Sequence, residues 1–170
     1  PLGIGVLTTA AKAGLASPEA MALAHRLMTT LNKAARDCMV RYAVHACTDV
    51  TGFGLLGHAF EMAQGSDTHL TLFPGEIDLI PEALELARDG ILPAGMYRNR
   101  HYAEAAVDPG STELAVQDML YDPQTSGGLL IAAAPEEADA LLRELRGAVP
   151  SAQRIGVVEA YNGGPRISLR

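Results

Sequence analysis

The chain has no tryptophan and is poor in cysteine and in aromatic residues. Its 170 residues include 5% aromatic residues and two cysteines, Cys38 and Cys47. Two cysteines are too few for a disulfide framework, and their separation does not fit a CxxC zinc site. These absences argue against a disulfide-stapled secreted domain and predict a cytoplasmic protein.

Positive charge is also scarce. The chain carries 13 lysines and arginines against 20 aspartates and glutamates, a net charge of -7, and no basic block. We therefore expect no nucleic-acid partner. No apolar run approaches the roughly 20 residues that cross a bilayer, so no membrane partner is expected either. Because the first residue is Pro1 rather than methionine, we expect the chain to be part of a longer gene product.

The remaining composition is that of a globular protein. Hydrophobic residues make up 48% of the chain and charged residues 19%, and the length fits a single domain over residues 1–170 with its own core. Apolar patterns and turn residues predict strands over 4–9, 42–47, 69–73, 127–133, 154–160 and 166–169. They predict helices starting at Ser17 and covering 33–40, 55–63, 81–88, 113–120 and 135–147, with a long loop over 91–111.

The last third has the clearest pattern. Residues 127–133 form a near-continuous apolar run, which predicts a central strand buried on both faces. The strand, helix and strand over residues 127–160 then read as a split βαβ unit.

The segment around which the chain is organised is His45-Ala-Cys-Thr-Asp-Val-Thr-Gly-Phe-Gly-Leu-Leu-Gly-His58. An apolar strand runs into Asp49, and glycines and a helix follow. Backbone amides at a helix start attract anions, which Asp49 would repel unless a cation lies between them. Mg²⁺ is bound by one or two carboxylates together with phosphate oxygens. We therefore predict that Asp49 is a Mg²⁺ ligand, whereas Thr51 could cap the helix as well as Asp49 could.

Residues 52–57 also match the letters of the dinucleotide fingerprint G-x-G-x-x-G. The acid that this fingerprint needs about 20 residues later is misplaced, because Glu76 and Asp78 follow a Pro-Gly turn. The other interpretation is a tight turn whose glycines allow close packing. We expect Gly52→Val to damage folding or the approach of a nucleotide, because a side chain would crowd the turn.

A second polar cluster, residues 121–128, runs directly into the apolar strand. Asp122-Pro123 and Ser126-Gly127 are turn signals, while the hydroxyls and amides of residues 125–128 could also form an anion-binding nest. Ser126 is not in a G-x-S-x-G elbow, which argues against a hydrolase. Residues 97–100 (Tyr-Arg-Asn-Arg) make a local basic spot that could contact a phosphate or stay solvated.

Taken together, residues 45–58 and Asp-Pro-Gln-Thr-Ser-Gly-Gly-Leu-Leu (122–130) closely resemble the selenophosphate synthetase (selenide, water dikinase) family. The opening residues 1–10 and residues 93–100 resemble it as well, so the resemblance spans nearly the whole chain in order. It implies the fold of the carboxy-terminal domain of aminoimidazole ribonucleotide synthetase-like proteins: an α+β fold, a mixed β-sheet with helices packed on it.

The resemblance also implies a function. The family makes selenophosphate from ATP, selenide and water, releasing AMP and orthophosphate, as a homodimer of two-domain subunits. Its carboxy-terminal domain supplies one Mg²⁺-binding aspartate, which corresponds to Asp49. We expect Thr51, Gly52 and Ser126 to contact the nucleotide, so that Mg²⁺ and ATP are the ligands of this region.

The family's catalytic Cys or Sec lies in an amino-terminal ATP-binding domain that this sequence does not contain. We expect no catalytic residue in the chain and no synthetase activity from the chain alone. The alternatives are a domain of another ATP-dependent synthetase or small-molecule kinase of the same superfamily, or a non-catalytic dimerisation module.

Overall fold

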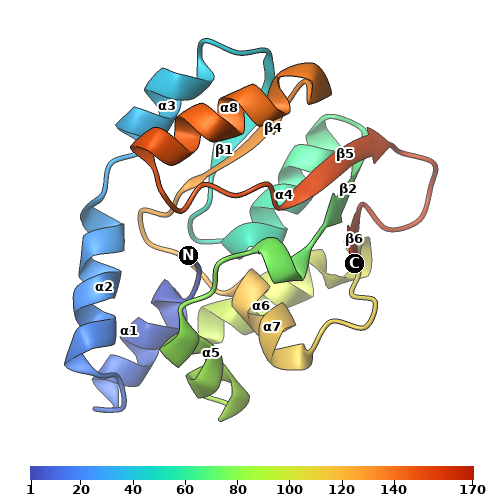
Figure 1. The fold of residues 1–170 in the computed structure, drawn as a ribbon. Helices are drawn as coiled ribbons and strands as arrows, with labels where there is room; N and C mark the ends of the chain where they lie inside the picture. Colours follow the sequence, from blue (N-terminus) through green and yellow to red (C-terminus); the bar gives the residue numbers. More distant parts are fainter.

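The computed structural model describes residues 1–170. The fold contains two separate β-sheets (Figure 1). An antiparallel pair consists of β1 (Val44–Asp49) and β4 (Leu129–Ala133). The other sheet is mixed and runs in the order β3 (Val107–Asp108), β6 (Ile167–Leu169), β2 (Thr68–Leu72) and β5 (Gly156–Ala160). Only the β2–β5 pairing in it is antiparallel. The predicted α+β class with a mixed sheet is confirmed, and the strands fall into two sheets.

Helices cover both sheets and build a third region away from them. The helices are α1 (Ile4–Lys12), α2 (Pro18–Thr29), α3 (Lys33–Met39), α4 (Gly54–Gly65), α5 (Pro81–Arg88), α6 (Ala94–Ala103), α7 (Leu114–Tyr121) and α8 (Pro135–Ala148), with short 3-10 turns at Pro74–Glu76 and Glu104–Ala106. None of these helices is long and apolar enough to cross a membrane.

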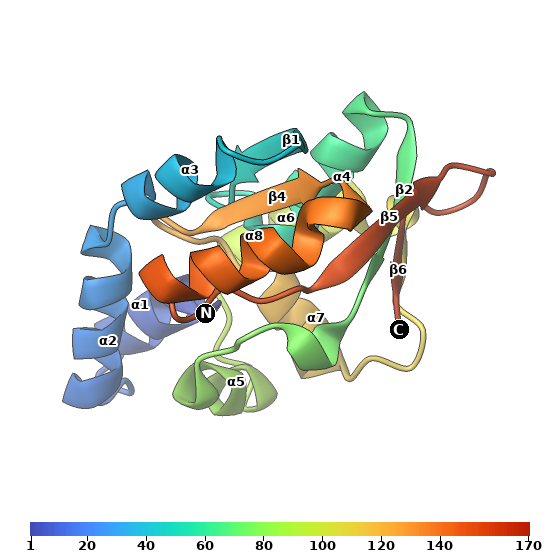
Figure 2. The ribbon, with the colours of Figure 1, turned by 45° about the horizontal axis from the view of Figure 1, so that its top comes forward.

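The apolar core has three parts that follow this division. One lies between the four-stranded sheet and α4, α6 and α7. A second joins α1, α2, α5 and α7, and α1 and α2 lie at the end of the molecule opposite the four-stranded sheet (Figures 1 and 2). The third lies where α3 and α8 pack beside the β1–β4 pair.

Several helix starts follow local sequence rules. Ser17 caps α2, since its Oγ accepts a hydrogen bond from the amide of Ala20 at 3.1 Å. Prolines occupy the first position of α2, α5 and α8, where a missing N–H costs nothing. Glu136 and Glu137 lie in the first turn of α8, near its positive end. The predicted helix over 81–88 is confirmed residue for residue.

The first predicted strand is wrong, because residues 4–12 form α1. The β-prone residues of this run have their side chains at helical spacing, so that Ile4, Leu7 and Ala10 are all buried. Gly3 begins the helix with a φ of 128°, which favours glycine. Tertiary packing and distant side-chain caps, described below, decide the conformation against local propensity.

The predicted loop over 91–111 is also wrong, because it contains α6, a 3-10 turn and β3. The buried face of α6 consists of Met96, Asn99 and Ala103. A polar residue in the middle of that face breaks the apolar periodicity on which helix prediction depends.

The position of β4 differs from the prediction as well. It pairs only with β1, and its residues are half-buried rather than buried on both faces. The strands β4 and β5 lie in different sheets, so residues 127–160 do not form a split βαβ unit. A short apolar run does not by itself show whether a strand is central in a sheet or, like β4, pairs with one neighbour only.

Candidate functional site

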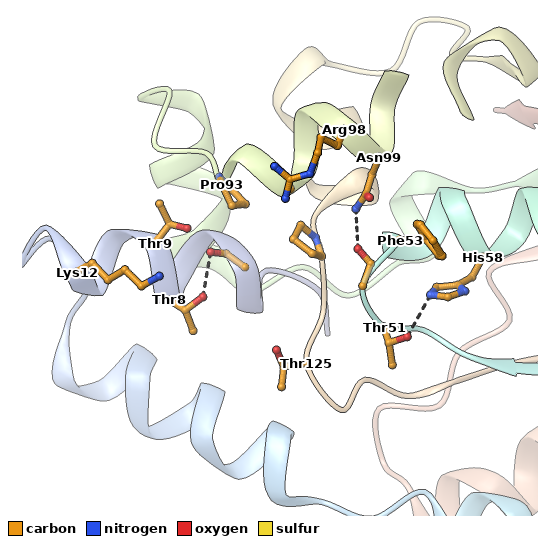
Figure 3. A pocket seen from close by; sticks show the side chains of 14 residues that line it. Thr8, Thr9, Lys12, Thr51, Phe53, His58, Pro93, Arg98, Asn99 and Thr125 are labelled. Carbon is orange, nitrogen blue, oxygen red and sulfur yellow. Dashed lines mark hydrogen bonds between the residues drawn. The ribbon is translucent and has the colours of Figure 1, made fainter. Parts of the chain in front are cut away.

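A polar cleft of about 690 Å³ opens where the loops after β1 and after α7 meet the helices α1 and α6 (Figure 3). Fourteen residues line it, and one of them is hydrophobic. They are Gly5, Thr8, Thr9 and Lys12 from α1, residues 51–53 and His58 around the start of α4, Pro93, Gly95, Arg98 and Asn99 around α6, and Pro123 and Thr125. Its size suits a ligand as large as a nucleotide.

The loop that joins β1 to α4 forms one wall of this cleft. Gly54 begins α4 with a φ of 70°, and a Cβ at this position would lie 2.7 Å from the carbonyl oxygen of Tyr121. Gly54 therefore allows the β1–α4 loop and the end of α7 to meet at backbone contact. A Cβ on Gly52 would meet nothing within 4 Å, so the prediction that Gly52→Val crowds the turn is wrong.

Two further contacts hold the same loops together. The Nδ2 of Asn99 donates to the carbonyls of Gly52 and Tyr121, both at 2.9 Å. The amide of Gln124 donates to the carbonyl of Thr51 at 3.0 Å. Asn99 is buried, and its two bonds replace the water that these carbonyls would otherwise require. The two motifs singled out in the sequence are thus one structural unit.

Thr51 does not cap α4, contrary to one interpretation of the sequence. The residue at the N-cap is Phe53, and no side chain accepts a hydrogen bond there. The Oγ1 of Thr51 lies 3.2 Å from Nε2 of His58, whose Nδ1 lies 3.1 Å from Glu61. These two side-chain contacts fix the orientation of Thr51 beside the cleft. The ring of Phe53 stacks on Tyr102 with centroids 5.5 Å apart.

The Asp122-Pro123-Gln124 segment caps helix α1. The Oδ2 of Asp122 accepts the amide of Gly5 at 2.9 Å, and Oε1 of Gln124 accepts the amides of Gly3 and Ile4 at 3.3 Å. These are amides that a helix cannot satisfy by itself. The polar residues of this motif therefore cap a distant helix, a role that sequence patterns did not reveal.

Asp122 is completely buried, and its Oδ1 has no hydrogen-bond donor. Burial raises the pKa of the Asp122 carboxyl to about 7, against the opposite effect of hydrogen bonds from Gln124 and from the amides of Gly5 and Val6. A Cβ on Gly5 would lie 2.4 Å from Oδ1, so only glycine fits beneath the carboxyl.

Asp49 ends β1 and lies two residues before the cleft lining. His45, Cys47 and Asp49 are the exposed residues of the alternating pattern of β1, so they share one face of the strand. Cys47 is a free, exposed cysteine. Partial burial and then the charge of Asp49 raise the pKa of the Cys47 thiol, which makes the thiol a poorer nucleophile at neutral pH.

The residues present fit a partial magnesium site. No group of three His, Cys, Asp or Glu side chains in the chain could hold a metal ion. Asp49 is exposed and makes no side-chain hydrogen bond or ion pair, which leaves its carboxylate free. Mg²⁺ commonly uses one or two carboxylates, with phosphate oxygens and water completing the shell. Asp49 could supply one such ligand to a metal–phosphate complex.

Of the three residues predicted to contact a nucleotide, two line the cleft and one does not. Thr51 and Gly52 line the cleft, whereas Ser126 is exposed outside it, with a φ of 50°. Its neighbour Thr125 lines the cleft instead. Gly127 has a packing role, since a Cβ there would lie 2.0 Å from the carbonyl oxygen of Val50.

Four residues of α1 were missed by sequence reasoning. Gly5, Thr8, Thr9 and Lys12 line the cleft at helical spacing. The same spacing is visible in the sequence, but reading residues 4–9 as a strand places Thr8 and Thr9 on opposite faces.

The glycines of the β1–α4 loop yield a direct test of this geometry. We expect Gly54→Ala to lower the free energy of unfolding by about 2 kcal/mol or more, because it combines a left-handed backbone with a clash against Tyr121. Gly52→Ala is the matched control and should change it by less than about 0.5 kcal/mol. Urea unfolding measures both, and equal effects of the two substitutions would contradict the described loop.

The fold and the β1–α4 loop are those of a known protein family. Residues 1–166 match the family model described as AIR synthase related protein, C-terminal domain. The chain belongs to this family.

Within it, the chain is similar to proteins named selenide, water dikinase. It is 43% identical to the one of Treponema denticola over 145 residues, which cover 85% of this chain and 41% of the relative. It is 43% identical to the one of Clostridium botulinum (strain Eklund 17B) over 159 residues, covering 93% and 46%. It is 48% identical to the one of Caldanaerobacter subterraneus subsp. tengcongensis over 145 residues, covering 85% and 42%. The chain thus spans less than half the length of these relatives.

Solved structures share the fold at low sequence identity. A hydrogenase maturation protein, HypE, superposes with a TM-score of 0.59 and 18% identity, covering 94% of this chain and 42% of that protein. Thiamine monophosphate kinase from Aquifex aeolicus gives 0.57 and 18%, covering 99% and 46%. At this identity the likeness concerns the fold alone.

Proposed function

We propose that the chain is the carboxy-terminal part of a two-domain selenide, water dikinase, which makes selenophosphate from ATP, selenide and water and releases AMP and orthophosphate. The observation that carries the proposal is the 43–48% identity to proteins of that name over 85% or more of this chain. The cleft adds support, because residues 51–53 of the most distinctive motif form its wall.

In this proposal the chain supplies one side of the nucleotide site. Asp49 would hold Mg²⁺ at the phosphates of ATP. Thr51 and Gly52 would contact the nucleotide from the wall of the cleft, and Ser126 would contact it from outside the cleft. The metal, when bound, neutralises phosphate charge during phosphoryl transfer. The chain's own part is to fix the β1–α4 loop, through Asn99 and Gln124, so that Asp49 and Thr51 keep one relative position. The catalytic Cys or Sec belongs to the amino-terminal domain.

Assembly and location complete the proposal. By its resemblance to the synthetase family we propose a homodimer. Both cysteines are unpaired, which agrees with a reducing cytoplasmic compartment.

The nucleotide product tests this function. The full-length protein of the parent gene, given ATP, Mg²⁺ and selenide, should produce AMP, orthophosphate and a selenophosphate signal in ³¹P NMR. The 170-residue chain by itself should produce none of them, because the nucleotide site is incomplete. Formation of ADP as the end product would instead indicate a small-molecule kinase of the same superfamily. A full-length protein that turns over no ATP would favour a dimerisation module.

A further inference from the structure

We infer that the cleft between α1 and α6 is a phosphate-binding site in its own right, in which Lys12 and Arg98 bind the anion directly without a bridging metal ion. The inference deepens the proposed function and rests on it for the source of the phosphate group. The carrying observation is the distribution of charge. The chain contains 20 acidic residues, yet none lines this cleft, while two cations do.

Neither cation is engaged elsewhere in the protein. No ion pair of the structure includes Lys12 or Arg98. By contrast, the neighbouring Arg100 is paired with Asp118 and lies over the ring of Tyr121. The two arginines of the basic spot thus have different roles: Arg100 joins α6 to α7, and Arg98 is left for a ligand.

The two cations come from separate helices and project toward the same space (Figure 3). Lys12 ends the stripe of α1 that also carries Thr8 and Thr9. The guanidinium of Arg98 folds back over the first turn of α6, with Nη2 only 3.7 Å from where a Cβ on Gly95 would lie. Gly95 therefore leaves the room between Arg98 and the start of α6 open.

The hydroxyl groups of the cleft favour a tetrahedral oxyanion. The Thr8 hydroxyl donates to the carbonyl of Ile4 at 2.9 Å, but Thr9 and Thr125 make no side-chain hydrogen bond within the chain. A phosphate has three or four acceptor oxygens and can accept from two cations and two hydroxyls at once. A carboxylate, with two oxygens, leaves more of these donors without a partner.

The site is distinct from the proposed metal site. Asp49 does not line the cleft, and a carboxylate there would repel a free anion. Lys12 and Arg98 can offset phosphate charge without Mg²⁺, since guanidinium and ammonium groups bind phosphate directly. Phosphate should therefore bind in the presence of a chelator.

Calorimetric titration of the 170-residue chain with inorganic phosphate, in EDTA at low ionic strength, tests the inference. We expect saturable binding that Lys12→Ala and Arg98→Ala each weaken about tenfold or more. Arg143→Ala, which removes an exposed and unpaired cation of α8, is the matched control and should leave the affinity unchanged. Lys12 and Arg98 are exposed, so both variants should keep the wild-type melting temperature.

Parallel titrations with AMP and with metal-free ATP identify the source of the phosphate. Inorganic phosphate binding as tightly as either nucleotide indicates a site for free orthophosphate. Binding of the nucleotides alone, with the same loss in the two variants, indicates a site for a nucleotide phosphate group. Absence of binding by all three, or binding that the two substitutions do not weaken, overturns the inference. The product assay above is independent, so either proposal can fail while the other stands.

Discussion

Replacement of Asp49 by alanine in the full-length protein is expected to lower the rate of Mg²⁺-dependent ATP turnover about 10²- to 10³-fold. The physical reason is that Asp49 would be the carboxylate of this chain that holds the metal against the phosphates. A free carboxylate at the end of β1, two residues before the cleft, has no other partner in the structure. The measurement is AMP formation as a function of Mg²⁺ concentration.

The same variant must keep its fold for this result to be informative. Asp49 is exposed, so we expect an unchanged melting temperature. Asp139→Ala on α8 removes another exposed carboxylate, one that does not line the cleft, and serves as the control with wild-type turnover. Turnover of Asp49→Ala near the wild-type rate would refute a metal-binding role for Asp49.

The second large effect concerns Asp122 and pH. With a pKa of about 7 in the folded protein, against about 3.9 in an unfolded chain, Asp122 binds its proton more tightly when the protein is folded. The free energy of unfolding therefore decreases as the pH rises from about 4 to about 7, and this group contributes up to about 4 kcal/mol of that decrease. Below this range and above it, the contribution of Asp122 does not change with pH.

Asp122→Asn isolates this contribution. The amide oxygen of asparagine can still accept from Gly5 and Gln124, while the group no longer titrates. The difference in unfolding free energy between variant and wild type should thus move in favour of the variant by several kcal/mol between pH 4 and pH 8, as measured by urea unfolding. Subtracting the unfolding free energy of the wild type at each pH removes the contributions of the other carboxyl groups. A difference that stays constant over this range would mean that Asp122 is ionised in the folded protein throughout.

Much of the local structure could be predicted because the signals are local. Ser17 and Pro18 mark the start of α2, and Pro81 that of α5, through contacts within one turn. The class of fold also followed from the sequence. The errors share a different cause: α1 depends on caps supplied by residues more than 100 positions away, and α6 buries a polar Asn99 whose two acceptors are distant carbonyls.

The site divides in the same way. The glycine-rich loop of residues 51–54 was visible as a motif, and Thr51 and Gly52 do line a cleft. The wall formed by α1 could not be predicted from the sequence, because Lys12 lines the cleft only when residues 4–12 are helical. The role of Asp122 was hidden for a related reason, since an Asp-Pro dipeptide indicates a turn and gives no sign of which helix its carboxylate caps.

The capping of α1 has a consequence for folding during synthesis. Its acceptors, Asp122 and Gln124, are separated from the amides they bind by 117 to 121 positions. Helix α1 therefore cannot be capped before residues 122–124 have been synthesised, and its own N-cap residue, Gly3, provides no side-chain cap. Contacts of such long sequence separation slow folding. Until these acceptors have been synthesised, the apolar residues of α1 lack the caps that hold them in the folded helix, and exposed apolar segments of this kind are prone to aggregate.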